Sequence, residues 1–264
     1  MEVGILTRRW MVVAFSMLSL MALSCHTKPA HRNRLDENGF PSVVLWAWER
    51  PEDLEFLDPQ RVAVAFLAQT IVLQGDKVSA RPRLQPLRVS PQTKLIAVTR
   101  IESVKNTGDQ PALSATQKER VIELVLKTLE RTNVSALQID YDAPTSEREF
   151  YRGVLLGLRA RMPDNVALSM TALASFCVGD RWLSDLPVDE AVPMIFRMGA
   201  DDKQIKNLLA GGGDFLEPLC RASYGVALDE PVNVSFGNSR RRYVFNPRSW
   251  TKDDVLSLVT GTRK

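Results

Sequence analysis

The chain has 264 residues, of which 45% are hydrophobic and 25% are charged, so it can bury a sizeable core in one or two domains. This ordinary composition, with 14 glycines and 15 prolines, excludes a disordered chain, a collagen and a small disulfide scaffold. The 34 Lys and Arg residues against 31 Asp and Glu residues leave a net charge of +3. Because that charge is too small for the electrostatic footprint of a nucleic-acid-binding protein, we expect no nucleic-acid partner.

Histidine is confined to the N-terminal edge of the sequence, at His26 and His31. The remainder therefore lacks the imidazole that Ser-His-Asp or Cys-His catalysis or a His-rich zinc site requires. A calcium ion among Asp140, Asp142 and Glu102 is a further alternative, but the sequence has no D-x-D-x-D-G loop. We expect neither a metal nor another cofactor.

The first 24 residues are typical of a targeting signal. Arg8 and Arg9 precede an apolar run that is shorter than a typical transmembrane helix. The run ends in Ala-Leu-Ser-Cys25, which resembles the bacterial lipoprotein signal, where the cysteine becomes the lipid-modified N-terminus. The sequence predicts an exported protein, held at a membrane by a lipid on Cys25 and facing the periplasm or the cell exterior. A cleaved soluble protein and an uncleaved anchor are the alternatives.

The polar segment 25–40 shows no hydrophobic period, as expected of a tether, and a single folded domain is predicted over 41–264. That domain contains Cys177 and Cys220. An oxidising, exported setting permits a disulfide between them, and two buried free thiols are equally compatible with the sequence. Neither lies in a C-x-x-C motif, so we assign them no chemistry.

Eight short apolar runs recur along the predicted domain. Most are continuous and rich in Val, Ile, Leu and Ala, which is typical of parallel strands buried on both faces. Eight such strands predict an α/β fold, a (β/α)8 barrel with some short or missing helices because the domain is small for this fold. A doubly wound open sheet is the alternative, but the glycine fingerprint expected after its first strand is absent. The runs begin at Val43, Val62, Lys94, Ala136, Val166, Ala191, Tyr224 and Arg242.

Two amphipathic helices are predicted between these strands. One spans residues 114–131, and the other begins at Ser146, where Ser-Glu-Arg-Glu predicts a capping box, and ends before Pro163. The arginines at 240–242 form a charge run that predicts a solvated surface. Weaker helices are expected over 51–57, 201–210 and 251–259, together with a hairpin that turns at Gly75.

Charged residues recur at the C-terminal ends of the predicted strands, where barrels of this type have their active sites. Asp140 and Asp142 share a face with Gln138, and two carboxylates at this spacing repel, which raises one pKa toward that of a general acid. Such residues also cap helices or form ion pairs, and Asp142 is a candidate N-cap for the next helix. The strand-end candidates are Glu49, Arg100, Glu102, Asp140, Asp142, Arg197, Asp229 and Glu230.

Four segments carry a resemblance to a known family. They are LWAWERPEDL, LQIDYDAPTSEREFY, LSMTALASFC and VDEAVPMIFRMG. Together they resemble exported bacterial proteins grouped as domain of unknown function family 3142. The resemblance covers nearly the whole predicted domain and implies an exported barrel related to glycoside hydrolases. The family itself has no established activity.

A more distant resemblance is to the chitinase-type family 18 glycoside hydrolases, whose fourth strand ends in D-x-x-D-x-D-x-E. Asp140 and Asp142 match the two later aspartates of that motif. Leu137 replaces its first aspartate, and Pro144 replaces the glutamate that serves as proton donor in the family. Proline cannot protonate a leaving oxygen.

The sequence therefore predicts a carbohydrate-active barrel, either a glycoside hydrolase or a catalytically reduced relative. In the enzyme, Asp140 or Asp142 would be the nucleophile or stabilising carboxylate, and Glu102, Asp229 or Glu230 the acid/base from across the mouth. One alternative is a non-catalytic envelope lipoprotein that binds a glycan or partner chain. Another is a scaffold in which every strand-end acid pairs with an arginine. The predicted substrate-binding residues are Trp46, Trp48, Glu49, Arg100, Gln138, Tyr141, Arg197 and Glu230.

Overall fold

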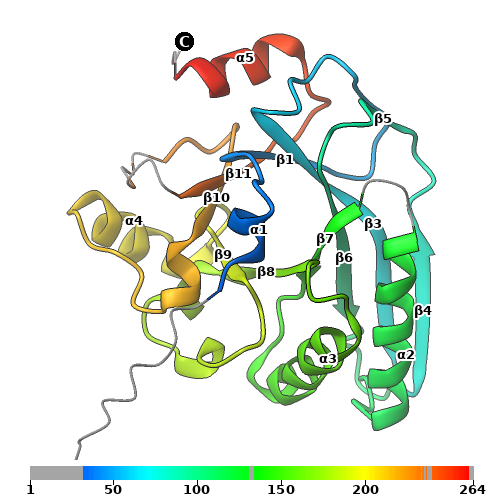
Figure 1. Ribbon diagram of the computed structural model, residues 1–264. Coiled ribbons are helices and arrows are strands. Elements are labelled where there is room, and N and C mark those ends of the chain that lie inside the picture. The colour runs from blue at the N-terminus through cyan, green and yellow to red at the C-terminus, as the bar shows by residue number, and fades with distance from the viewer. Residues whose placement is uncertain (1–31, 131–133, 233, 235, 237–239, 262–264) are drawn as a thin grey trace, which may run out of the picture. The chain divides into compact units, whose positions relative to one another are not determined.

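Eight parallel strands form a closed ring in the computed structural model, which describes residues 32–130, 134–232, 234, 236 and 240–261 (Figure 1). The ring closes because β1 (Val43–Ala47) pairs with β3 (Val62–Gln74) on one side and with β11 (Arg241–Phe245) on the other. This arrangement confirms the predicted α/β barrel. The other members, in order, are β6 (Leu95–Ser103), β7 (Val134–Asp140), β8 (Ala167–Leu173), β9 (Glu190–Met194) and β10 (Ser223–Ala227).

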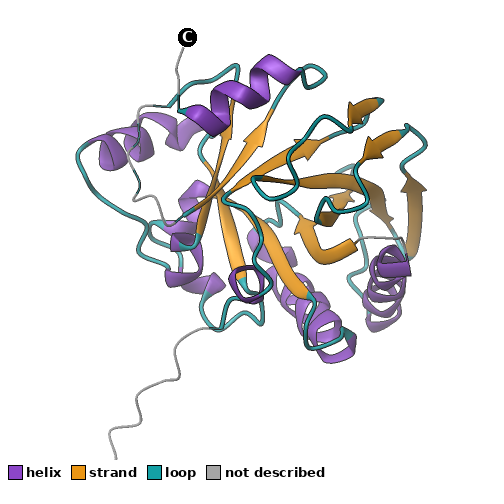
Figure 2. Cartoon of the chain, turned by 45° about the horizontal axis from the view of Figure 1, so that its top comes forward, coloured by secondary structure: helices purple, strands orange, loops and turns teal. Residues whose placement is uncertain are grey.

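Some of the segments between the strands form α-helices and others form only short turns or loops, as the small size of the domain predicts (Figure 2). The hairpin is confirmed: β4 (Lys77–Pro82) runs antiparallel to β3 after a turn at Gly75, whose φ of +50° favours glycine. The helix predicted over 51–57 is wrong, because that segment forms β2 (Glu52–Leu54), which pairs with β5 (Leu87–Val89) in a separate small sheet. The α-helices outside the ring are α2 (Ala115–Leu126), α3 (Arg148–Arg161), α4 (Asp202–Ala210) and α5 (Lys252–Thr260).

Helix starts are only partly as predicted. The Ser114 side chain caps α2 by accepting from the Gln117 amide at 3.2 Å. The capping box at Ser146 is wrong, because the chain first forms the 3-10 helix η2 (Thr145–Glu147), and α3 begins at Arg148 without a side-chain cap. The remaining 3-10 helices are η1 (Lys127–Glu130), η3 (Ala174–Cys177), η4 (Arg181–Leu183), η5 (Gly199–Asp201) and η6 (Pro218–Arg221).

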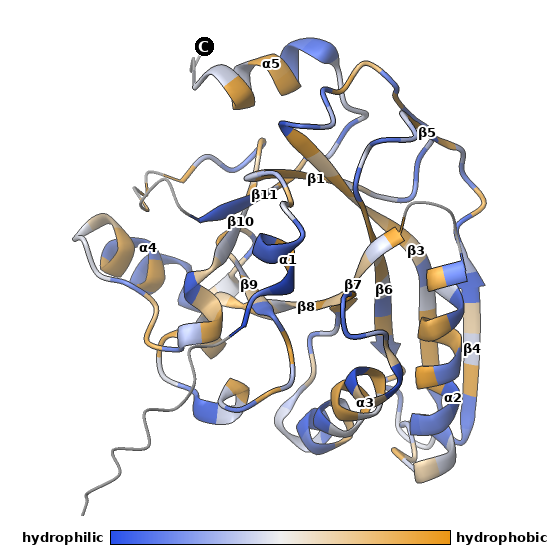
Figure 3. Ribbon diagram, in the orientation of Figure 1, coloured by the Kyte–Doolittle hydropathy of each residue, from blue (hydrophilic) through white to orange (hydrophobic). Residues whose placement is uncertain are grey.

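β1 and the first part of β3 are hydrophobic on both faces, as expected of barrel strands (Figure 3). On β1, Val43 and Leu45 belong to the outer core, which the helices cover. Val44 and Trp46 alternate with them and point into the barrel. The interior is packed with side chains and is not a pore. It also includes Ala63, Ala65, Ile96, Val98, Ala136, Ala167, Val192 and Tyr243.

The short helix α1 (Arg34–Glu37) lies at the N-terminal end of the strands, within the ring as viewed in Figure 1. Leu35 and Phe40 join the interior core, and Arg34 pairs with Asp189, just before β9, at 2.9 Å. Residues 32–40 are part of the segment predicted as a polar tether. The folded part of the chain therefore begins before residue 41.

The arginine run at 240–242 is only partly solvated, which corrects its prediction as a solvated surface. Arg241 is 3% exposed, and its guanidinium pairs with the buried Glu190 at 3.0 Å. Glu190 also accepts from the Tyr243 hydroxyl at 2.6 Å, and Arg241 reaches Asp36 on α1. A buried charge needs such partners, and these lie too far away in sequence for a local pattern to indicate them.

Cys177 and Cys220 form a disulfide, with their Cα atoms 5.9 Å apart, which decides between the two alternatives left by the sequence. The bond joins η3, after β8, to η6, before β10. In the described part of the chain, no helix is long and apolar enough to cross a membrane. The same residues contain no cluster of three or more His, Cys, Asp and Glu side chains suited to a metal.

Candidate active site

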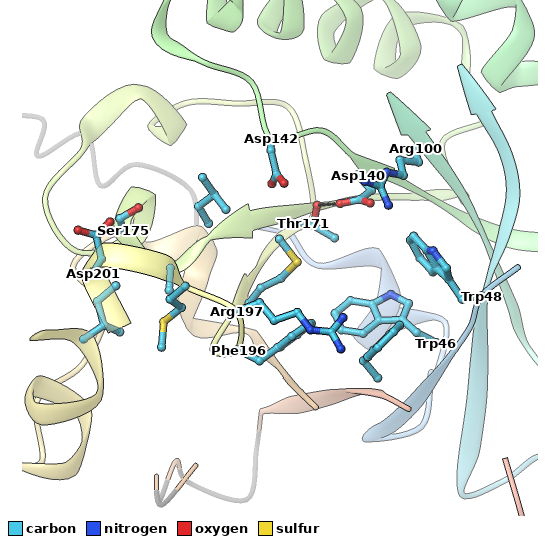
Figure 4. Close-up of a pocket in the computed structure, with 16 residues that line it drawn as sticks. Trp46, Trp48, Arg100, Asp140, Asp142, Thr171, Ser175, Phe196, Arg197 and Asp201 are labelled. Carbon is cyan, nitrogen blue, oxygen red and sulfur yellow. Dashed lines mark hydrogen bonds between the residues drawn. The ribbon is translucent and has the colours of Figure 1, made fainter. Parts of the chain in front are cut away.

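A cavity of about 320 Å³ opens at the C-terminal end of the barrel strands (Figure 4). Its walls come from the ends of β1, β6, β7, β8, β9 and β11 and from the loops that follow them. This is the position in which a barrel of this class places its active site. The cavity, called the mouth pocket below, is lined by Trp46, Trp48, Arg100, Asp140, Asp142, Thr171, Leu173, Ala174, Ser175, Met194, Phe196, Arg197, Met198, Asp201, Ile205 and Phe245.

Asp140, the last residue of β7, lies deep in this pocket. Its Oδ1 accepts a hydrogen bond of 2.7 Å from the Thr171 hydroxyl on β8. Loss of hydration raises the pKa of Asp140 to about 6, and the negative charge of Asp142 adds to the rise. The Thr171 hydrogen bond and the charge of Arg100 act in the opposite direction. Asp140 is therefore a carboxyl group that holds a proton under mildly acidic conditions.

Asp142 stands nearer the opening and is exposed to solvent. The pocket walls still remove part of its hydration, which raises its pKa, while the charges of Arg100 and Lys105 lower it. Within the described residues, Asp142 makes no hydrogen bond or salt bridge. Asp142 is therefore the more hydrated of the two aspartates, and Asp140 is the more buried.

Four aromatic rings form one wall of the mouth pocket. Phe196 and Phe245 stack with their centroids 5.9 Å apart, and Trp48 meets Phe245 edge-on at 6.3 Å. Trp46 packs beside Phe196 at 6.2 Å. The absence of a side chain at Gly225 makes room for Trp46, since a Cβ there would lie 2.8 Å from the indole ring. Such a wall offers apolar surface for the faces of sugar rings.

Gln138 lies inside the barrel, behind the aromatic wall, and does not line the pocket. Its prediction as a substrate-binding residue is therefore wrong. It is fully buried, and its Oε1 accepts from the Trp46 indole N–H at 2.8 Å. Its Nε2 donates to the Ser169 hydroxyl, which in turn donates to Glu190. The polar chain inside the barrel thus ends on a pocket residue and fixes the orientation of its ring.

Glu102 lies outside the mouth pocket and is held by two arginines. Arg81 and Arg100 each approach its carboxylate to 3.1 Å. It lines a second hollow that shares Arg100, Asp140 and Asp142 with the mouth pocket. Arg100 is therefore a pocket residue as predicted, but the prediction that Glu102 acts from across the mouth is not supported by this pairing.

The acids after β10 are also ion-paired and do not line the mouth pocket. Asp229 pairs with Arg197 at 3.2 Å. Glu230 accepts from Lys206 and from the Arg197 main-chain N–H, each at 2.9 Å, and these bonds lower its pKa. The sequence predicts both acids beside the bound sugar, whereas in the structure they contact the loop that carries Arg197.

Two further predicted residues lie away from the mouth pocket. Glu49 is exposed and is not among the lining residues. Tyr141 points outward from the barrel, packs against Tyr151 at 5.1 Å, and hydrogen-bonds Ser103 and Glu147, so it lines only the second hollow. Period-two alternation along β7 already assigns Tyr141 to the face opposite Asp140 and Asp142.

The structure adds Asp201 and Ser175 to the residues that the sequence predicts for the site. Both line the mouth pocket and also a third hollow beside α4. Asp201 is exposed and has no hydrogen bond or ion pair with a described residue. It lies in η5, several residues beyond the end of β9, so inspection of strand ends alone misses it. The mouth pocket shares lining residues with the second and the third hollow, and the three together are called the groove below.

Comparison with known proteins gives similarity of fold. No family model and no curated protein matches the chain, so the resemblance to domain of unknown function family 3142 stays a prediction. The chain is similar to the spore cortex-lytic enzyme SleL of Bacillus cereus, with 17% identity and a TM-score of 0.47, covering 72% of this chain and 51% of that one. It is also similar to the chitinase domain of the spore coat protein CotE of Clostridium difficile, with 14% identity and a TM-score of 0.38, over 70% and 49% of the two chains.

A third similar structure is a family GH18 chitinase from Chromobacterium violaceum, with 14% identity and a TM-score of 0.47, over 79% of each chain. The chain spans about half the length of the SleL and CotE structures.

Proposed function

We propose that the mouth pocket binds a carbohydrate chain and hydrolyses a glycosidic bond, with Asp140 and Asp142 as the reacting carboxyl groups. One observation carries this proposal: two neighbouring carboxyl groups with raised pKa values, neither of them salt-bridged to a described residue, share a pocket with an aromatic wall. Groups with perturbed pKa values in a cleft are candidates for catalysis.

Glycoside hydrolysis needs one carboxyl group that donates a proton and one carboxylate that supports the positive charge at the anomeric carbon. Near pH 6, Asp140 holds a proton for about half of the time, and we assign the role of the carboxylate to the more exposed Asp142. Protonated Asp140 would transfer its proton to the glycosidic oxygen as the bond to the anomeric carbon breaks. Asp142 would stabilise the oxocarbenium-like state. Water would then add to the anomeric carbon and give one proton to Asp140, which restores the starting enzyme.

The groove favours a chain of sugars over a single ring. The second hollow extends it past Arg100, and the third extends it past Ser175 and Asp201. Asp140 and Asp142 line both the mouth pocket and the second hollow. A chain bound along the groove would therefore present an internal linkage to the two aspartates.

The second candidate function is glycan binding without catalysis. The three acids predicted to act from across the mouth favour this function. Glu102, Asp229 and Glu230 all pair with cations and do not line the mouth pocket. Pro144 also stands where the chitinase-type motif has its proton donor. Asp201 is then the remaining carboxyl group on the far side of the pocket.

Product analysis and binding measured on the same oligosaccharides separate the two candidate functions. Purified protein is incubated with a panel of neutral and acidic oligosaccharides, and the mixture is examined by mass spectrometry, with binding measured in parallel by calorimetry. The hydrolase predicts shortened products from at least one member of the panel. Saturable binding without any shortened product would overturn hydrolysis in favour of the binding function.

We also propose that the protein is exported and carries a lipid on Cys25. The signal segment 1–24 and Cys25 lie outside the described residues, so this proposal rests on the sequence pattern alone. Expression of the full chain in a bacterial host with lipoprotein processing, followed by mass spectrometry of the N-terminal peptide, tests it. A diacylglycerol-modified Cys25 supports the anchor, and an unmodified N-terminus contradicts it.

A further inference from the structure

Arg197 has an unusual backbone conformation at the edge of the mouth pocket. Its φ is +52°, in the left-handed region that residues other than glycine seldom adopt. Glu230 accepts a 2.9 Å hydrogen bond from the Arg197 main-chain N–H, and Lys206 in turn holds Glu230. The loop thus maintains a strained backbone at a pocket residue, and strain of this kind clusters at functional sites.

The Arg197 side chain is oriented as well. Its guanidinium lies over the Phe245 ring, 4.9 Å from the centroid, and Figure 4 shows the side chain extending toward Trp46. Stacking on an aromatic face restricts the side chain while leaving the edge of the guanidinium open. A guanidinium that is already ordered loses little conformational entropy when it binds a ligand.

The hydrogen-bonding capacity of Arg197 is only partly used. Its Nη2 donates to Asp229 at 3.2 Å, whereas its Nε and Nη1 donate to no described residue. The side chains of Arg197 and Asp229 are 55% and 41% exposed. Because an exposed ion pair of this kind is weak, a ligand carboxylate can compete for the guanidinium.

We infer that Arg197 binds the carboxylate of an acidic sugar, so that the pocket selects carbohydrate chains that carry carboxyl groups. The inference rests on the proposed carbohydrate function and narrows its substrate class. The planar guanidinium presents two parallel N–H groups, and the two oxygens of a carboxylate can accept from both of them. A neutral hydroxyl has a single oxygen and cannot make this paired contact. The carboxylate belongs either to a uronic acid or to a lactyl ether substituent on an amino sugar, and both present the same group to Arg197.

The test uses ligands that differ only in charge. Calorimetry compares an oligogalacturonate with its methyl ester, and the disaccharide of N-acetylglucosamine and N-acetylmuramic acid with its methyl ester. We expect the acid form of one pair to bind at least about ten-fold more tightly than its ester, because esterification removes the charge-assisted hydrogen bonds. The pair that shows the preference identifies the source of the carboxylate.

Variants assign this preference to Arg197. Arg197→Gln should abolish the preference by weakening the acid form while leaving ester affinity within about two-fold, and Arg197→Lys should restore only part of it. Arg120→Gln is the matched control, since Arg120 is a half-exposed arginine that is paired with Glu123 and lines none of the three hollows. Thermal unfolding confirms that each variant is folded.

The outcomes separate this inference from the proposed function. Equal affinity for acid and ester in the wild type, an equal loss of both in Arg197→Gln, or no binding of any of the four ligands overturns the inference. Turnover of neutral oligosaccharides that depends on Asp142 but shows no charge preference would leave the hydrolase standing without it. Charge-selective binding without turnover would retain the inference and remove catalysis.

Discussion

Thr171 donates a 2.7 Å hydrogen bond to Asp140 from the neighbouring strand, and this bond opposes the rise in the Asp140 pKa caused by burial. Thr171→Val keeps the shape of the side chain but removes the donor that stabilises the ionised carboxylate. We therefore expect the pKa of Asp140 to rise further above 6. Titration of the Asp140 carboxyl carbon by NMR measures it, with Thr171→Ser as the control that keeps a hydroxyl. An unchanged or lowered pKa in Thr171→Val would show that the bond does not stabilise the charged form.

The same burial makes ionised Asp140 unfavourable for stability. The pKa is about 6 in the folded protein against 3.8 without perturbation, so the folded state binds more protons than the unfolded state between these values. Stability attributable to this group is therefore lost as the pH rises through that window, by up to about 3 kcal/mol above pH 6. We expect Asp140→Asn to be more stable than the wild type at pH 8 and similar to it at pH 3.5. Urea unfolding at both pH values checks this, and a variant less stable at pH 8 would contradict it.

The disulfide between Cys177 and Cys220 closes a segment with a sequence separation of 43 residues. By the chain-entropy relation, a loop of this size stabilises the folded state by about 4 kcal/mol. The double variant Cys177→Ala, Cys220→Ala should lower the free energy of unfolding by a few kcal/mol. Because η3 also carries the pocket residue Ser175, ligand affinity should fall as well. Urea unfolding of the wild type with and without reductant gives an independent measurement, and identical midpoints would exclude this contribution.

Two arginines of the barrel provide a contrast between buried and exposed ion pairs. Arg241→Met leaves the buried Glu190 without its cation, so we expect a loss of about 3–5 kcal/mol of stability. Arg248→Met breaks the pair with Asp254, in which the arginine side chain is 62% exposed, and should change stability by less than about 1 kcal/mol because Thr251 still donates to Asp254. Chemical denaturation of both variants tests the ranking. Equal losses of stability would mean that the buried pair of Arg241 and Glu190 contributes no more than an exposed pair.

Much of the fold could be predicted because barrel strands are buried on both faces. The continuous apolar runs near Val62 and Ala191 coincide with β3 and β9, and the 3.6-residue period finds α2 and α3. Local patterns fail where long-range contacts decide the structure. Residues 52–54 form a strand because 87–89 pair with them, and Arg241 is buried because Glu190 and Asp36 lie against it.

Only the side of the mouth pocket that β7 forms could be predicted from the sequence. Asp140 and Asp142 share a face of a single strand, which spacing alone indicates, and the structure brings them together with Trp46 and Trp48. The far side depends on how the loops fold. Ion pairs turn the acids after β10 away from the pocket, and η5 brings Asp201 into it from beyond a strand end.

The most direct test of the account is the rate of sugar release by Asp142→Asn from the oligosaccharide that the wild type cleaves best. The substitution keeps the shape of the side chain but removes the carboxylate, so we expect the rate to fall by at least about a hundred-fold. Asp76→Asn, which makes the same change at an exposed residue of the β3–β4 turn, should retain the wild-type rate. A wild-type rate in Asp142→Asn would contradict the assignment of glycoside hydrolysis to this pair of aspartates.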